Sequence, residues 1–231
     1  MHAIEQYEID TAAELLALAY QHDLHSQLEM EHVKGSDAFL AIRAQTYIET
    51  LFGKAAIWIE EESPKRILIA YQNKRFSPMR FVKLIRDSTD AIEAAAEKEQ
   101  LDQMIQNGKK LKKLENYVWH GKLMPKKQTY YHLLTLFTEP EGMNTDVVYD
   151  MLEPFMSYCD RYGMPMTYET WDDRMEAIMK NLCFEVKKTV ESRKCPGVVV
   201  RYMVREPQTE EENLQPLSEP DGGYEGETDY K

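Results

Sequence analysis

The chain lacks the features that would place it in several common classes of protein. Its 231 residues include three cysteines, Cys159, Cys183 and Cys195, without a C-x-x-C pair, which argues against a disulfide framework or a zinc ribbon. No apolar run approaches the roughly 20 residues that span a bilayer. The N-terminus also lacks a basic segment followed by an apolar one. We therefore expect reduced thiols and a cytoplasmic protein without membrane contacts.

Positively charged residues are also fewer than negatively charged ones, 28 against 40. The formal net charge is −12, and no basic stripe is interleaved with aromatic residues, so nucleic-acid binding is not expected. Residues 206–231 hold nine acidic residues and one lysine and contribute −8 of that charge. They contain too few large apolar side chains to offset the entropy of ordering them. We expect a disordered acidic tail; the alternative is an arm that binds a protein partner or inhibits the domain.

The rest of the chain is able to bury a core, because 43% of the residues are hydrophobic. We expect one domain over residues 1–205, with a helical insertion at about 74–127. Strand and helix patterns alternate, which predicts an α/β (α+β) protein with a mixed sheet. The expected strands are 2–8, 55–60, 67–72, 130–137, 166–170, 184–192 and 198–204, the last two joined by a turn at 194–197. The expected helices are 11–30, 36–51, one starting within 80–85, 89–114 with a break at Asn107-Gly108, 145–162 and 173–181.

Several motifs after residue 117 resemble those of a known family. They are His120-x-x-x-Met124-Pro125 followed by Tyr130-Tyr-His-Leu133, then Tyr168-Glu-Thr170, then Phe184-Glu-Val186. In this order and spacing they resemble the fourth, fifth and sixth strands of the GNAT acyl-CoA N-acyltransferases. The resemblance covers residues 2–205 and implies the GNAT fold, in which two central strands splay apart.

The resemblance also implies an activity. Family members transfer an acetyl group from acetyl-CoA to an amine, here the amine of an unidentified small molecule. The pantetheine arm of the cofactor would pair with main-chain groups at Leu136 and Thr138. Such a transfer needs a neutral amine, a polarised carbonyl and one base, and no covalent nucleophile.

The loop that should hold the pyrophosphate departs from the family pattern. Glycines there would let phosphate oxygens approach the backbone at a helix N-terminus, but residues 143–148 read Met-Asn-Thr-Asp-Val-Val. Asp146 adds a charge that repels phosphate, and Asn144 or Thr145 would cap the helix instead. The positions that correspond to the cofactor loop are Asn144, Thr145, Asp146, Val147 and Val148. We expect them to bind pyrophosphate weakly or to form an ordinary helix start.

Few residues are candidates for catalysis. Glu169 lies on the expected fifth strand beside the splay, where desolvation would raise its pKa as a base requires; the alternative is a structural carboxylate paired with a neighbour. Glu139 lies where the fourth strand ends. His132 alternates with buried positions and is expected to be a residue of the sheet. The tyrosine that often protonates the leaving thiolate is replaced by Met179, which cannot donate a proton, with Cys183 at the position of a family glycine.

Two further clusters have simpler interpretations. His22, His25, Glu29 and His32 would share one side of a continuous helix and would suit zinc or nickel. Nothing completes a closed coordination shell, so a solvated face is favoured and no metal site is expected. The lysines at 109, 110, 112, 113, 122, 126 and 127 are expected to be a solvated surface, which would steer an acidic substrate, a nucleotide phosphate or the acidic tail.

Three functions agree with these residues. The first is a divergent N-acetyltransferase that uses acetyl-CoA and a small amine. The second is a GNAT-fold protein without catalysis that serves as a binding or regulatory module, which the missing glycines and tyrosine favour. The third is a partner-binding protein that acts through the tail or the helical insertion. We favour the first because of the family resemblance.

Overall fold

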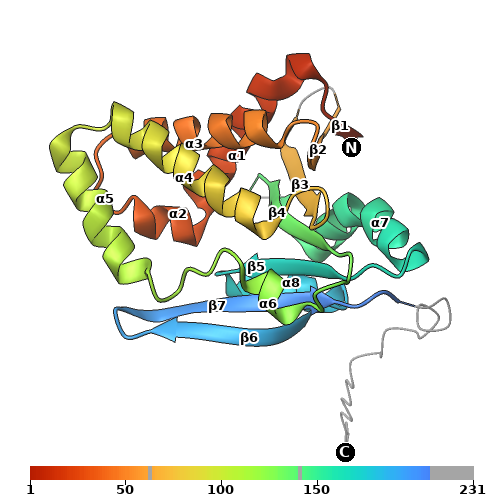
Figure 1. Cartoon of the computed structure of the whole chain (residues 1–231). Helices are drawn as coiled ribbons and strands as arrows, with labels where there is room; N and C mark the ends of the chain where they lie inside the picture. Colours follow the sequence, from red (N-terminus) through yellow and green to blue (C-terminus); the bar gives the residue numbers. More distant parts are fainter. Residues whose placement is uncertain (62–63, 140–141, 209–231) are drawn as a thin grey trace, which may run out of the picture.

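The computed structural model describes residues 1–61, 64–139 and 142–208 (Figure 1). Its strands are β1 (His2–Ala3), β2 (Ala56–Ile59), β3 (Arg66–Gln72), β4 (Tyr131–Thr138), β5 (Met166–Thr170), β6 (Glu185–Ser192) and β7 (Cys195–Arg205). Its α-helices are α1 (Ile9–His22), α2 (Leu24–Glu29), α3 (Ser36–Leu51), α4 (Pro78–Ala95), α5 (Lys98–Leu111), α6 (Trp119–Leu123), α7 (Thr145–Arg161) and α8 (Asp173–Asn181), with a 3₁₀ turn at Gln6–Glu8.

The strands form one mixed sheet in the order β1-β2-β3-β4-β5-β7-β6. All neighbouring pairs are antiparallel except β4 and β5, which are parallel and are connected through α7. A parallel pair needs such a crossover because its second strand must start at the same end of the sheet as the first. This architecture confirms the predicted α/β (α+β) class.

Helices cover both faces of the sheet, and β3 shows why. Ile67 and Ile69 pack with α1, α3 and α4 on one face, whereas Leu68 and Ala70 pack with α7 and α8 on the other. Successive side chains of a strand point to opposite faces. A strand covered on both sides therefore reads as a continuous apolar run rather than as an alternating pattern.

The segment between β3 and β4 is helical, as expected for the insertion at about 74–127. It contains α4, α5 and α6. Its second half packs against β7, where the Trp119 ring stacks on Tyr202 with 4.5 Å between centroids and Leu111 and Leu114 join the same apolar cluster. This packing holds the residues between α5 and α6 against β7 (Figure 1).

Most predicted elements are confirmed to within one or two residues. The helix 36–51, the strand 166–170 and the helix 173–181 have the predicted bounds. Cys183 has a left-handed backbone with φ of 63°, which agrees with its assignment to a glycine position. Among the described residues, no helix is both long and apolar enough to span a membrane.

The predicted continuous helix 11–30 is wrong. Asp23 has an extended backbone, with ψ of 127°, so α1 ends at His22 and α2 starts at Leu24. The Asp23 carboxylate accepts hydrogen bonds from the Ser26 N–H and hydroxyl, both at 2.9 Å. An N-cap of this kind starts a new helix inside a sequence with helical periodicity.

The predicted helix break at Asn107-Gly108 is also wrong, because both residues lie inside α5. The break instead falls at Ala96, between α4 and α5. Asn107 is buried, and its side-chain amide donates to the carbonyl oxygens of Glu29 at 3.0 Å and Glu31 at 2.8 Å. A tertiary contact therefore uses the side chain that would otherwise favour a turn.

Two smaller expectations need correction, and a third is untested. The first strand covers only His2–Ala3 of the expected 2–8. The last hairpin turns at Arg193-Lys194 rather than at 194–197, because Ser192 already pairs with Cys195. Most of the predicted disordered tail, residues 209–231, lies outside the described residues, so its disorder stays a prediction.

Two adjacent substitutions in α5 should have opposite effects on stability. Asn107→Ala removes two buried hydrogen bonds to the end of α2 and should lower the free energy of unfolding by about 1–3 kcal/mol. Gly108→Ala should raise it by up to about 1 kcal/mol, because an added Cβ would have no atom within 4 Å. Urea unfolding of both variants measures the difference. A destabilised Gly108→Ala variant would contradict a helix that continues through this position.

Candidate active site

A cavity of about 460 Å³ opens where β4 and β5 separate. The two strands pair over only three positions, from Tyr131 with Met166 to Leu133 with Tyr168. Beyond that point Glu169 and Thr170 pair only with β7, and the register between β3 and β4 skips Leu134, which forms a bulge. The predicted splay is therefore confirmed.

The bulge determines which main-chain groups of β4 face the opening. Before it, the Tyr131 N–H donates to the Pro165 carbonyl directly before β5, at 3.0 Å. After it, the Glu139 N–H donates towards the other side, to the Lys65 carbonyl directly before β3, at 3.3 Å. Because alternate residues of a strand face opposite neighbours, Leu136 and Thr138 direct their N–H and C=O groups to the side from which β5 has diverged.

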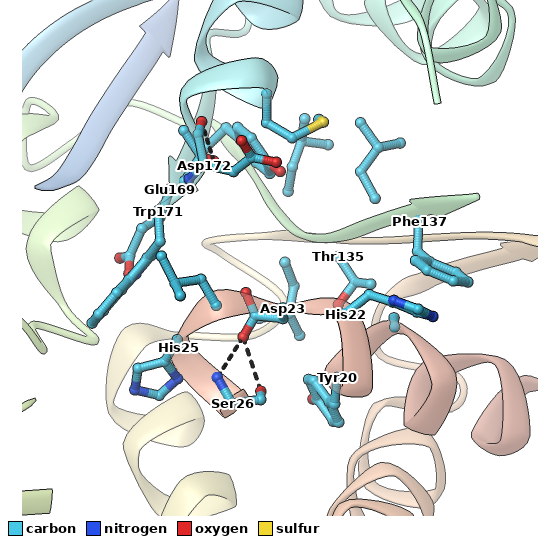
Figure 2. A pocket seen from close by; sticks show the side chains of 18 of the residues that line it. Tyr20, His22, Asp23, His25, Ser26, Thr135, Phe137, Glu169, Trp171 and Asp172 are labelled. Carbon is cyan, nitrogen blue, oxygen red and sulfur yellow. Dashed lines mark hydrogen bonds between the residues drawn. The ribbon is translucent and has the colours of Figure 1, made fainter. Parts of the chain in front are cut away.

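Two groups of elements form opposite walls of the cavity. Figure 2 shows Glu169, Trp171 and Asp172 at the end of β5 on one side, and Tyr20, Asp23 and His25 of the α1–α2 junction on the other. Further wall residues come from α3, α4 and the segment between α5 and α6. The cavity thus joins the predicted site on β5 to helices that lie far away in the sequence.

Glu169 is the most perturbed carboxyl group of this cavity. Burial raises its pKa from the ordinary 4.5 to about 7, although a hydrogen bond from the Trp171 indole N–H at 2.8 Å and the positive charge of His25 oppose the shift. The negative charge of Asp23 adds to the increase. No cation forms an ion pair with Glu169 among the described residues.

Two other carboxylates of the cavity are paired with basic side chains. Glu29 forms a bidentate ion pair with Arg43, with N–O distances of 2.7 and 2.8 Å. Burial opposes the charged form of Glu29, but the nearby guanidinium outweighs it and lowers the Glu29 pKa. Glu115 accepts from His25 Nε2 at 3.0 Å. Burial disfavours the charged imidazole, yet this bond and the surrounding carboxylates raise the His25 pKa.

The start of α7, to which the resemblance assigns the pyrophosphate, is a capped helix. The Asn144 side chain accepts from the Val147 N–H at 3.0 Å, which confirms the predicted capping. Val148 is fully buried in the core and Asp146 is exposed. Arg174 of α8 donates to the Met143 carbonyl directly before this cap. A guanidinium therefore lies beside the loop that lacks the glycines.

The remaining catalytic candidates lie away from the opening or are already hydrogen-bonded. Glu139 pairs with Lys65 at 3.1 Å on the surface. His132 lines the cavity but is buried, and its Nδ1 bonds to the Thr167 hydroxyl at 3.0 Å. Burial, with the nearby His120, holds the His132 pKa well below its ordinary value, so the ring is neutral at pH 7. Met179 is fully buried in the core.

The lysine cluster agrees with its simpler interpretation, but the expected solvated face of the histidine cluster is wrong for two members. His25 and Glu29 line the cavity and are paired with Glu115 and Arg43. The break at Asp23 interrupts the helix that would have aligned His22, His25 and Glu29. His32 is exposed, with φ of 63°. No three metal-ligating side chains are grouped in the part of the chain that the structure describes. The seven lysines are exposed.

Sequence reasoning missed most of the cavity wall. Asp23, Glu115 and Trp171 were assigned no role, nor were Arg43 and Arg174. A cap signal was present at Asp23, because aspartate is among the residues most preferred at a helix N-cap. The ion pair of Arg43 and the position of Arg174 have no sequence signal, since their partners lie 14 and 31 residues away.

Comparison with known proteins identifies the fold. No protein-family model and no curated protein sequence match the chain. A Corynebacterium glutamicum structure described as histone acetyltransferase HPA2 and related acetyltransferase has 14% identity and a TM-score of 0.58, covering 90% of this chain and 96% of its own. An N-acetyltransferase from Staphylococcus aureus has 12% identity and a TM-score of 0.53, covering 88% and 98%.

A third solved structure, mosquito arylalkylamine N-acetyltransferase like 5b, has 13% identity and a TM-score of 0.51, covering 89% of this chain and 98% of its own. All three likenesses extend over nearly the whole described chain. At these identities they establish the fold. The chain therefore has the GNAT acetyltransferase fold predicted from its motifs.

The raised pKa of Glu169 should make stability depend on pH. Between about 4.5 and 7 the folded protein keeps a proton that the unfolded chain has released, so stability falls as pH rises through this range and stays lower above it. Glu169→Gln cannot ionise and should be more stable than the native chain at pH 8, by about 1–2 kcal/mol given the partial exposure of the group. Thermal unfolding at pH 5 and pH 8 measures this. An equal stability difference between Glu169→Gln and the native chain at both pH values would contradict the raised pKa.

Proposed function

We propose that the protein transfers an acetyl group from acetyl-CoA to the amine nitrogen of a small molecule, with Glu169 as general base. The observation that carries the proposal is a carboxyl group with a pKa of about 7 at the edge of a cavity between splayed strands. A base whose pKa lies near the working pH is efficient in proton transfer. The GNAT fold supports the same reaction class.

The chemistry needs few groups. Glu169 takes a proton from the substrate ammonium, directly or through one water, and frees the nitrogen lone pair. The nitrogen then attacks the thioester carbonyl and a C–N bond forms. The nitrogen releases its second proton to water, and the C–S bond breaks. The thiolate leaves with the electron pair and takes a proton from water, since Met179 has none to give.

Acetyl-CoA would lie along the opening of the sheet. The free main-chain groups of Leu136 and Thr138 would pair with the pantetheine amides, as β5 would if it continued beside β4. The pyrophosphate would then reach the start of α7, where residues 144–148 take the loop positions. Asn144 already occupies one N–H group there, and Asp146 repels phosphate. Arg174 would supply a positive charge that the glycine-free loop lacks.

Calorimetric titration with acetyl-CoA and with CoA at moderate salt tests the cofactor site. We expect micromolar binding of both ligands, after which candidate amines are screened for transfer. The absence of binding at millimolar ligand would exclude acetyl transfer. It would favour the alternative of a catalytically inactive GNAT-fold module that binds other ligands or partners.

Removal of the Glu169 carboxylate should lower kcat/KM and remove its dependence on pH. We expect kcat/KM of the native protein to rise with pH and to level off above about 7, because Glu169 must be ionised to accept a proton. Glu169→Gln should lower kcat/KM by about 10²–10⁴-fold. Glu139→Gln is the matched control, because Glu139 is an exposed carboxylate outside the cavity. Steady-state kinetics from pH 5.5 to 9 measure both variants. Unchanged turnover in Glu169→Gln would exclude this base.

Loss of Arg174 should weaken cofactor binding at the pyrophosphate alone. Arg174→Ala should raise the Kd for CoA about tenfold, the effect of one charge-assisted contact, and should leave the Kd for pantetheine unchanged, because pantetheine has no pyrophosphate. Lys180→Ala is the control, since it removes the same charge from the same helix outside the cavity. Calorimetry measures the Kd for CoA and the Kd for pantetheine in each variant and in the native chain. Equal weakening of both ligands would point to a general loss of structure.

A further inference from the structure

The unneutralised negative charge of the cavity is concentrated at one end. Five carboxylates line it. Glu29 and Glu115 are paired with Arg43 and His25, whereas Asp172 follows β5 beside Glu169 and caps α8, accepting from the Arg174 N–H at 2.7 Å. Asp23 and Glu169 form no ion pair among the described residues. Asp23 lies at the α1–α2 junction, across the cavity from Glu169 (Figure 2). A cation entering the cavity is therefore attracted to the space between these two carboxylates.

Asp23 has an oxygen free for a ligand. Both hydrogen bonds that it accepts, from the Ser26 N–H and hydroxyl, end on Oδ2. In Figure 2 the other carboxylate oxygen points into the cavity, away from Ser26. The cap fixes this carboxylate on the protein before any ligand arrives, so little side-chain entropy is lost on binding. A carboxylate held in this way is suited to accept a hydrogen bond from an ammonium group.

The wall beyond Asp23 is aromatic and offers no site for a second cation. The Tyr47 ring packs edge-on against Tyr20 and Phe81, with centroids 6.1 and 6.2 Å apart. The Arg43 guanidinium already lies over the Tyr20 ring, 5.9 Å from its centroid, and holds both oxygens of Glu29. A second ammonium placed here would lose its hydration and would meet the positive charge of Arg43. An apolar body would instead bury its surface against the rings.

We propose that Asp23 binds the ammonium of the acceptor, and that the acceptor is a monocationic amine with an apolar body rather than a diamine. This inference rests on the proposed function in that the bound amine is the one that would be acetylated. Asp23 determines specificity: its Oδ1 holds the ammonium next to Glu169, and the rings of α1, α3 and α4 contact the rest of the molecule.

Direct binding tests this without any turnover. The probes are hexylamine, 1,6-diaminohexane and 1-hexanol, which share a six-carbon chain and differ in charge. Each is titrated into the full chain with and without CoA, and binding is measured by calorimetry or protein NMR. We expect hexylamine to bind the native protein more tightly than 1,6-diaminohexane does.

Asp23→Asn separates the charge of this residue from its structural role. Asparagine caps helices as well as aspartate does, so the break between α1 and α2 should persist and the melting temperature should stay within a few degrees. The variant should bind hexylamine about tenfold more weakly and 1-hexanol as well as the native chain does. Asp10→Asn is the control, because Asp10 lies in the first turn of α1, outside the cavity, and its loss should not change hexylamine binding.

Three results would overturn the inference: no binding of hexylamine to the native chain, unchanged hexylamine binding in Asp23→Asn, or tighter binding of the diamine. Failure of the proposed function is distinct, since it appears as an absence of acetyl-CoA binding or of transfer. The amine-binding result can be interpreted in either case.

Discussion

The separation of β4 from β5 is the constraint on which the other features of the site depend. Three paired positions hold the two strands together at one end, and the bulge at Leu134 then reverses which β4 residues face the gap. β5 remains attached to β7 along its whole length, so the sheet stays continuous although its centre opens. Main-chain groups that would have completed a ladder are left for a ligand, and Glu169 is left at the edge of a cavity instead of beside β4.

Desolvation and ion pairing together give this cavity its charge pattern. Burial alone would favour the neutral form of every carboxyl group there. Glu29 and Glu115 are paired with Arg43 and His25, whereas Glu169 accepts from the Trp171 indole and forms no ion pair within the described residues. Its pKa is about 7. The same burial that lowers stability at high pH brings the Glu169 pKa near 7, and the proposed role of Glu169 as a base rests on that value, so the stability and the proposed chemistry have one physical origin.

Sequence reasoning succeeded where local pattern and tertiary packing agree. The helix 173–181 was predicted because its apolar period and its cap are local, and the β3 strand because a sheet covered on both faces requires a continuous apolar run. It failed at Asp23, where a helical period continues across a real break. It failed again at Asn107, where a residue typical of turns is held in a helix by the carbonyl groups of α2.

The sequence by itself determined the order of strands and helices, the α/β class, the resemblance to the GNAT fold and the replacement of the loop glycines at residues 143–148, because each depends on neighbours along the chain. Tertiary structure alone decided which charges meet. Glu29 pairs with Arg43, and His25 pairs with Glu115. Asp23 faces Glu169 across the cavity, although 146 positions separate the two residues in the sequence. Interactions through space between groups so far apart leave no periodicity or spacing in the sequence, so the charge pattern of the cavity could be read only from the folded chain.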